Sequence, residues 1–291
     1  MEDGTISVRS WIDSAKLRLA SNGVDSPGLE AQLLAGHVLL VNRPWLLAHA
    51  EEPFPELAGE SVLDRRLNGE PLAYILGYRE FYGRRFAVGP GVLIPRQDTE
   101  ILVEAALSTM RSLNVPQPNI LDLGTGSGCI AITLKLEAPT WNVTASDLSQ
   151  KALEIAMQNG QYLNADVTWI CADGFAGMDS RKFDVIVTNP PYIGLNEPLA
   201  KEVKGFEPHQ ALYSGDTGLE FYLRLSMEAK QRLHPGGFLL MEVGYEQAKT
   251  VEELFADAGW THAQTVRDLA GIPRVVVCTN ENEDLVDQTA V

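Results

Sequence analysis

The stretch that decides the fold is Asn119-Ile120-Leu121-Asp122-Leu123-Gly124-Thr125-Gly126-Ser127-Gly128. Its first half has the apolar character of a buried strand, and its second half is a glycine-rich turn that leads into a helical pattern. Glycine reaches positive φ without steric cost, so such a turn brings the backbone close to a ligand. The spacing Gly-x-Gly-x-Gly differs from the Gly-x-Gly-x-x-Gly of dinucleotide folds. The stretch predicts a ligand-binding crevice at the carboxyl end of a strand, and the alternative is a tight connection without a ligand.

Predicted strands and helices alternate along the rest of the chain from about residue 98. The predicted strands are Asn119–Leu123, Asn142–Ser146, Val167–Cys171, Asp184–Thr188, Gly237–Val243, Ala263–Arg267 and Arg274–Thr279. The predicted helices are Thr99–Leu113, Cys129–Leu136, Gln150–Asn159, Gly218–Leu233 and Tyr245–Ala258. Such alternation is typical of an α/β protein whose mostly parallel sheet is covered by helices on both faces. We therefore expect a doubly wound, seven-stranded sheet that ends in a hairpin-like pair of strands.

Changes in pattern divide the chain into four segments. Residues 1–78 have helical spacing without strand signals and predict a small helical domain. Residues 79–97 are rich in aromatic and β-branched side chains on either side of Gly83, which predicts a β-hairpin linker. Residues 98–280 hold the α/β pattern, and the acidic, polar residues 281–291 predict a disordered tail.

Composition restricts the class of protein and its partners. The net charge is −16, from 23 basic and 39 acidic residues, which argues against broad binding to a phosphate backbone, so nucleic acid is an unlikely partner. The 3 cysteines and 5 histidines are scattered without metal-ligand spacing, so we expect no metal. No apolar stretch approaches the roughly 20 residues of a membrane span, and the acidic start lacks the features of a signal peptide. We expect a cytoplasmic protein without membrane contact.

Two further strand ends supply polar groups to the same edge of the predicted sheet. Asp147 closes the strand after the glycine turn, where a carboxylate accepts hydrogen bonds from ribose hydroxyls. Its alternative role is to cap the next helix. Asp173-Gly174-Phe175 ends the following strand, where Asp173 could take the exocyclic amine of adenine and Phe175 could pack on the ring. The alternative for this third turn is a polar surface loop.

A rigid turn follows the β-branched run Val185–Thr188 and reads Asn189-Pro190-Pro191-Tyr192. Proline has no N–H and a fixed φ, so two prolines end the strand and hold the turn stiff. The amide oxygen of Asn189 and rigid backbone carbonyls accept hydrogen bonds from a planar –NH2 group, while the Tyr192 ring packs against it. The turn predicts a site for a planar nitrogen nucleophile, and the alternative is a simple strand terminator.

The combined pattern resembles class I S-adenosylmethionine-dependent methyltransferases. The resemblance implies that S-adenosylmethionine is the methyl donor and S-adenosylhomocysteine the product. Asp122 would then lie near the methionine part of the cofactor, above Gly124, Gly126 and Gly128. With a sulfonium methyl donor, Asn189 would stabilise the positive charge that develops on the acceptor nitrogen and would point its lone pair at the methyl group.

Four segments resemble one family of these enzymes more narrowly. They are Ile94–Glu100 (Ile-Pro-Arg-Gln-Asp-Thr-Glu), Asn189–Ile193, Phe206–Leu212 and Arg267–Arg274. Together with the order of helical domain, hairpin and α/β domain, they resemble the protein-(glutamine-N5) methyltransferases that modify peptide chain release factors. The resemblance covers nearly the whole chain up to about residue 280.

The resemblance implies methylation of the glutamine in the Gly-Gly-Gln loop of a release factor, which would dock on the helical domain. The acceptor glutamine would be held by Asn189, Pro190, Pro191 and Tyr192. The cofactor would be held by Asp122, Gly124, Thr125, Gly126, Ser127, Gly128, Asp147, Asp173, Gly174, Phe175 and Asn189. The family often has an aromatic residue where Gly174 stands, so packing on adenine is assigned to Phe175.

Three other functions share parts of this pattern. A glutamine methyltransferase of a ribosomal protein would have both sites, but its linker usually differs from residues 94–100. A DNA or RNA amino-methyltransferase would need a basic recognition domain and a base-flipping pocket, and residues 1–80 hold no basic cluster. A binding module without chemistry would have no need of the residues in the Asn189–Tyr192 turn.

Overall fold

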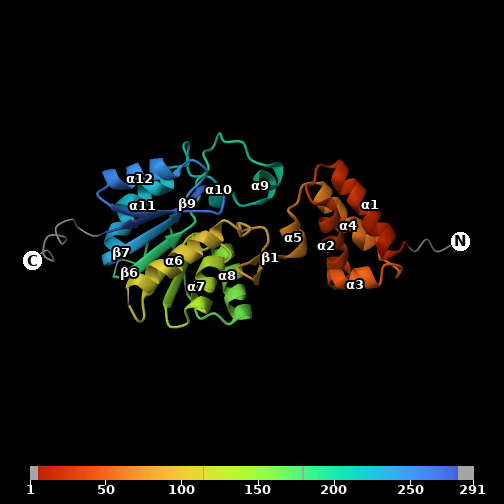
Figure 1. The fold of residues 1–291 in the computed structure, drawn as a ribbon, viewed down its shortest axis with the longest axis horizontal. Helices are drawn as coiled ribbons and strands as arrows, with labels where there is room; N and C mark the ends of the chain where they lie inside the picture. The colour runs from red at the N-terminus through yellow and green to blue at the C-terminus, as the bar shows by residue number, and fades with distance from the viewer. Residues whose placement is uncertain (1–5, 114, 179, 281–291) are drawn as a thin grey trace, which may run out of the picture. The chain divides into compact units, whose positions relative to one another are not determined.

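The computed structural model describes residues 6–113, 115–178 and 180–280 (Figure 1). The chain forms two compact units. Among the described residues, one unit comprises residues up to Tyr78 together with Leu199–Phe206, and the other comprises Arg79–Pro198 together with the residues from Glu207 onward. The tail that we expected to be disordered lies outside the described residues.

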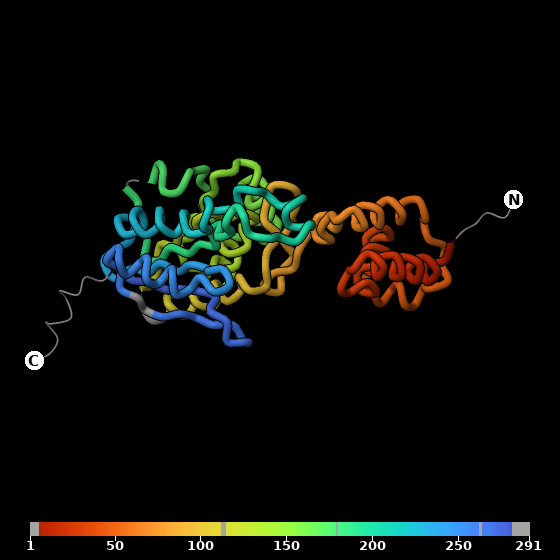
Figure 2. Tube along the Cα trace, turned by 90° about the horizontal axis from the view of Figure 1, so that it is seen from above, coloured from red at the N-terminus to blue at the C-terminus, as the bar shows by residue number. Residues whose placement is uncertain are grey.

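The first unit is a bundle of short helices, and those before residue 78 are drawn in red and orange in Figure 2. Its helices are α1 (Val8–Ser21), α2 (Pro27–Leu39), α3 (Arg43–Ala48), α4 (Glu56–Leu67), α5 (Leu72–Leu76) and α9 (Lys201–Phe206). The core is built around Trp11, which is 1% exposed and stacks on Phe54 with ring centroids 4.5 Å apart. Gly59 lets α4 pack directly against these two rings, because a Cβ there would clash with both.

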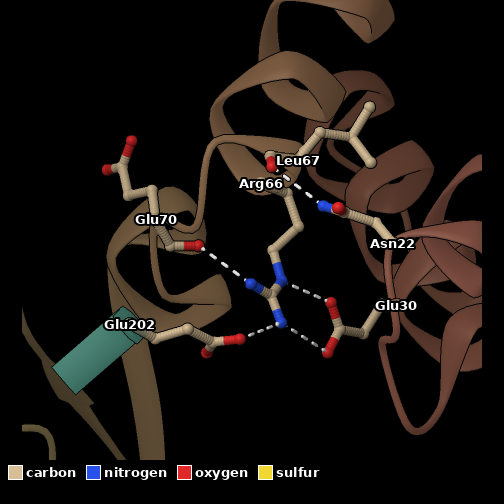
Figure 3. Close-up of polar contacts among 6 residues, drawn as sticks. All are labelled: Asn22, Glu30, Arg66, Leu67, Glu70 and Glu202. Carbon is tan, nitrogen blue, oxygen red and sulfur yellow. Dashed lines mark hydrogen bonds and ion pairs between the residues drawn. The ribbon is translucent and has the colours of Figure 1, made fainter. Parts of the chain in front are cut away.

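Helix α9 joins this bundle through the buried guanidinium of Arg66 (Figure 3). Arg66 Nε and Nη2 donate to the two carboxylate oxygens of Glu30 at 2.6 and 3.3 Å, and Nη2 also lies 3.0 Å from Glu202 Oε1 on α9. The backbone oxygen of Glu70 accepts from Nη1 at 3.4 Å. We expected residues 199–206 to belong to the α/β domain, because nothing in their spacing shows which helices they contact.

The second unit holds a two-stranded sheet and a seven-stranded sheet. The small sheet is the expected hairpin, β1 (Tyr78–Phe81) and β2 (Arg84–Ala87). The large sheet has the order β5-β4-β3-β6-β7-β9-β8. Its strands are β3 (Asn119–Leu123), β4 (Asn142–Asp147), β5 (Thr168–Cys171), β6 (Phe183–Thr188), β7 (Leu233–Glu242), β8 (Thr261–Arg267) and β9 (Pro273–Thr279). Strand β9 runs antiparallel to both β7 and β8, and the remaining pairs are parallel, which confirms the predicted fold class.

Helices cover both faces of the large sheet (Figure 1). The helices of this unit are α6 (Thr99–Leu113), α7 (Cys129–Glu137), α8 (Gln150–Leu163), α10 (His209–Leu212), α11 (Glu220–Glu228) and α12 (Ala248–Asp257). Successive side chains of a strand point to opposite faces. Ile120 of β3 accordingly packs in the cluster with α6 and α7, whereas Leu121 packs in the cluster with α11 and α12.

The largest difference from the expected elements lies between α11 and β7. We expected one helix over Gly218–Leu233, but α11 ends at Glu228 and a 3₁₀ helix, Ala229–Arg232, follows it. The strand then begins at Leu233, earlier than expected, because Leu233 pairs with Phe183 across an irregularity in the register. None of the helices in the described residues is long and apolar enough to cross a membrane.

Candidate active site

A cavity of about 450 Å³ lies where the strand order reverses, with β4 on one side of β3 and β6 on the other. Open α/β sheets bind ligands at this switch point, outside the carboxyl ends of the strands. Turns after four strands line the cavity, and they contribute Gly124 and Gly126 after β3, Asp147 to Ser149 after β4, Asp173 and Gly174 after β5, and Asn189 to Pro191 after β6. The volume lies in the range of about 300–1,000 Å³ that is usual for small-molecule sites.

The glycine turn presents its backbone to this cavity. Gly124 and Gly126 have φ of 77° and 55°, which side chains rarely adopt, and a Cβ at either position would meet nothing within 4 Å. The Gly124 and Thr125 amides both donate to the Ser146 carbonyl at 2.9 Å, which ties the turn to β4. The turn is therefore rigid on one side and open on the side of the cavity.

Asp147 lies on the cavity wall and also supports the glycine turn. Its Oδ2 accepts from the Gly126 amide and its Oδ1 from the Ser149 amide, each at 2.8 Å. The helix cap falls to Ser149, whose hydroxyl accepts from the Ala152 amide at 3.2 Å. Burial raises the pKa of Asp147, and the backbone amides oppose this rise. Each carboxylate oxygen has a second acceptor site, so Asp147 can still accept from ligand hydroxyls.

Four residues that we expected to contact the cofactor lie on the side of the glycine turn that faces away from the cavity. Asp122 is fully buried, and its Oδ2 accepts from Thr125 Oγ1 at 2.6 Å and from the Ala131 amide at 3.1 Å. Burial raises the pKa of Asp122 to about 7. Ser127 is 2% exposed, and a Cβ on Gly128 would press on side chains of α7 and α8. The cavity-lining residues include neither Asp122, Thr125, Ser127 nor Gly128.

In the turn after β5, some residues line the cavity and others are buried in the core. Asp173 and Gly174 line the cavity, and Asp173 Oδ1 lies 2.5 Å from Nη1 of Arg224 on α11. Phe175 is 4% exposed and packs in the core with α11, so it is not part of the cavity wall. A Cβ on Gly174 would lie 2.6 Å from Arg224 Nη2, so Arg224 occupies the space that a side chain at position 174 would need.

Two apolar residues that were not predicted from the sequence also line the cavity. Leu148 is 56% exposed although it lines the cavity, and Phe221 of α11 lines it as well. Leu148 follows Asp147 directly, and that adjacency is the signal that could have marked it. No local pattern in the sequence indicates that Phe221 lies at the cavity, because only the packing of α11 brings it there.

The Asn189 side chain is held in one orientation at the end of β6. Its Nδ2 donates to Thr99 Oγ1 at 3.1 Å, which leaves the carbonyl oxygen Oδ1 as an acceptor. The hydroxyl of the preceding Thr188 donates to the Leu123 carbonyl at 2.7 Å and ties this turn to the glycine turn. Asn189, Pro190 and Pro191 all line the cavity, so the two turns predicted from the sequence meet at one site.

Tyr192 supports the turn from the side of α12. Its backbone oxygen accepts from Gln247 Nε2 at 2.9 Å, and a Cβ on Gly244 would lie 3.0 Å from its ring. Burial, and then the charge of Glu242, raise the pKa of Tyr192 to about 12, so the phenol is neutral. Its ring packs on the core cluster of α11 and α12 and is not part of the cavity wall.

Two further segments line the cavity, one at the end of the linker and one around α10. Residues 91–93 of the linker line the cavity, as do Pro208, Gln210, Ala211 and Tyr213 around α10. Glu207 joins these segments, because its buried carboxylate accepts from the Ile94 amide at 3.0 Å and lies 2.5 Å from Arg96 Nη2. Glu207 thus connects the two segments and does not itself line the cavity.

A seven-stranded sheet of this order, with glycine and acidic turns around one cavity, defines the protein as a class I methyltransferase. The family model "PrmC N-terminal domain" matches residues 10–77, and "Methyltransferase small domain" matches residues 97–201. A methyltransferase from Pyrococcus furiosus has the same fold, with a TM-score of 0.52 at 17% identity over 77% of this chain and 100% of that chain.

Sequence similarity narrows the class to one family. The release factor glutamine methyltransferase of Koribacter versatilis is 42% identical over 94% of this chain and 98% of its own length. The protein of the same name from Bordetella pertussis is 45% identical over 86% of this chain and 93% of its own length. The chain belongs to the release factor glutamine methyltransferase family.

Proposed function

We propose that the protein transfers a methyl group from S-adenosylmethionine to the side-chain nitrogen N5 of the glutamine in the Gly-Gly-Gln loop of peptide chain release factors. The observation that carries the proposal is the orientation of Asn189. Its amide NH2 is engaged by Thr99, and its carbonyl oxygen is left as an acceptor beside the cavity. An acceptor in this position suits a substrate that presents a planar –NH2 group. The named relatives support a glutamine amide as that group.

The residues of the cavity fit S-adenosylmethionine. The open inner side of Gly124 and Gly126 accommodates a ligand pressed against the backbone, and Asp147 has free acceptor sites for the ribose hydroxyls. Leu148 and Phe221 offer apolar surface for the adenine ring, in place of Phe175, which lies in the core. When bound, the cofactor supplies an electrophilic methyl group on a positively charged sulfur.

The chain's own residues prepare a weak nucleophile. An amide nitrogen has a delocalised lone pair, so orientation and charge stabilisation must supply most of the catalysis. Asn189 Oδ1 and the Pro190 carbonyl would accept the two N–H groups of the glutamine and fix its lone pair on the line of transfer. As the methyl group is transferred, these two acceptors would stabilise the positive charge that develops on the glutamine nitrogen. The nitrogen then loses a proton to water, so no strong base is needed beforehand.

Two further parts of the proposal concern residues outside the cavity wall. Tyr192 would pack on the glutamine once the substrate is bound. The helical unit would dock the release factor and thereby select the substrate protein. A cytoplasmic location belongs to the same proposal, because release factors act on the ribosome.

Incubation with radiolabelled methyl donor and purified release factor tests the proposal directly. The wild-type release factor should be labelled at one equivalent, and a factor with a Gly-Gly-Ala loop should not be labelled. Equal labelling of both factors would refute the assignment of the acceptor. Labelling of plasmid DNA or of ribosomal protein in parallel reactions would point to the corresponding alternative function.

A further inference from the structure

A buried carboxylate lies behind Asn189 and has no role in the mechanism so far. Glu242 is the last residue of β7 and is 3% exposed. Strands β6 and β7 are neighbours, and Thr188 pairs with Met241, so the next residue of each strand brings Asn189 beside Glu242. Thr99, at the start of α6 and 2% exposed, completes the group. Three different elements thus place three polar side chains together beside the reacting end of the cavity.

The hydrogen bonds within this group have only one consistent direction. Asn189 Nδ2 donates to Thr99 Oγ1 at 3.1 Å. A threonine hydroxyl has one proton, so Thr99 remains free to donate to an acceptor, and both Thr99 and Asn189 hydrogen bond with the Glu242 side chain. The second carboxylate oxygen, Oε2, has no hydrogen-bond partner among the described residues. An ionised carboxylate is only an acceptor, so it requires NH2 and not the carbonyl of Asn189 to face inward.

We propose that Glu242, acting with Thr99, is a positioning residue that sets the orientation of the Asn189 side-chain amide. With NH2 held inward, Oδ1 faces outward as the acceptor for the substrate. A flip of the amide by 180° would place Oδ1 against the carboxylate and would offer NH2 to the substrate nitrogen, which has no use for a second donor. The inference rests on the proposed function only for its kinetic readout, because the orientation exists without a substrate.

The orientation of the Asn189 amide should depend on pH, because burial and nearby charges shift the pKa of Glu242. Burial, followed by the nearby charge of Asp98, raises the pKa of Glu242 to about 7, and Arg274 on β9 opposes the rise. Arg274 is itself held at 2.9 Å by both Asp98 and Asp268. The remaining titratable neighbours are Tyr192, Tyr222 and Cys129, whose pKa values burial raises, so they are neutral near pH 7. Protonation gives Glu242 a donor, and the requirement for an inward NH2 is then relaxed.

The kinetic test compares three variants with the wild type on release factor. Thr99→Val keeps the shape and removes the hydroxyl, and it should lower kcat about 30-fold with little change in KM. Glu242→Gln can donate as well as accept, so it should lower kcat about 10-fold and remove the fall in kcat between pH 8 and 6. Thr99→Ser keeps the hydroxyl and should stay within about threefold of wild type. The control is Thr133→Val, because Thr133 is also fully buried but its hydroxyl has no hydrogen-bond partner among the described residues.

A second measurement does not depend on the substrate. The side-chain NH2 signal of Asn189 in ¹⁵N-edited NMR, assigned by its loss in Asn189→Ala, should shift with pH around 7 in the wild type and not in Glu242→Gln. An invariant signal together with a wild-type pH profile in Glu242→Gln would overturn the inference. Wild-type enzyme that fails to label release factor would refute the proposed function instead, and the NMR result would still decide the orientation.

Discussion

The substitution Asp122→Asn should change how the stability of the protein depends on pH. Asp122 is fully buried, and burial raises its pKa from the ordinary 3.8 to about 7. Between these two values the folded state binds more protons at this site than the unfolded state, so stability falls as pH rises. The shift of about 3 units corresponds to about 4 kcal/mol, since one unit is about 1.36 kcal/mol. This loss of about 4 kcal/mol in the free energy of unfolding is absent below pH 3.8 and complete above about pH 7.

Asparagine has nearly the same shape but carries no charge, so the variant should lose this part of the pH dependence. Its new NH2 replaces Oδ1, which has no hydrogen-bond partner among the described residues, and an unpaired buried donor costs about 1–3 kcal/mol at every pH. Urea unfolding from pH 4.5 to 8 measures both effects. The free energy of unfolding of the variant, relative to wild type, should rise by about 3–4 kcal/mol across this range.

The matched control is Asp257→Asn, which removes an exposed carboxylate at the end of α12 instead of a buried one. It should leave the difference from wild type nearly constant with pH. Parallel curves for Asp122→Asn and wild type would refute the reasoning, because they would mean that the Asp122 carboxylate is not penalised by burial.

Three further predictions concern the Asn189–Tyr192 turn, the glycine turn and the helical unit. Asn189→Ala should abolish methyl transfer while calorimetry finds cofactor affinity within about tenfold of wild type; an equal loss of both would mean that Asn189 mainly holds the cofactor. Gly126→Ala should weaken cofactor binding at least tenfold, because the methyl group enters the cavity, whereas Gly177→Ala, also at positive φ with open space around it, should cost only stability. Arg66→Met should destabilise the helical unit by about 1–3 kcal/mol in thermal or urea unfolding, because it leaves the Glu30 carboxylate, whose side chain is 16% exposed, without its partner. Glu202→Gln removes only the half-exposed partner on α9 and should cost less than about 1 kcal/mol; equal losses for both variants would contradict the central role of Arg66.

The sequence was sufficient for the fold and for the two turns that define the site. The seven strands were recognisable because each buried strand needs a short apolar run, and the helices between them have helical spacing. The glycine turn and the Asn189–Tyr192 turn were recognisable because glycine and proline restrict or free φ locally, whatever surrounds them. Their positions after β3 and β6 then required them to meet at one edge of the sheet.

The tertiary structure decided which residues of each turn face the cavity. Asp122 and Phe175 stand in the expected turns, but one lies behind the glycines and the other in the core. Glu242 and Thr99 carry no local signal, since their role depends on β7 lying beside β6 and on where α6 begins.

The sequence by itself determined the α/β class and the crevice at the strand ends, and it predicted a planar-nitrogen site at Asn189, because these depend on interactions within a few residues. Only the tertiary structure decided that α9 belongs to the helical unit and that Glu242 and Thr99 orient Asn189. The physical reason is that local patterns encode backbone preference and burial. Contacts between distant residues depend instead on strand order and packing, which no single segment contains.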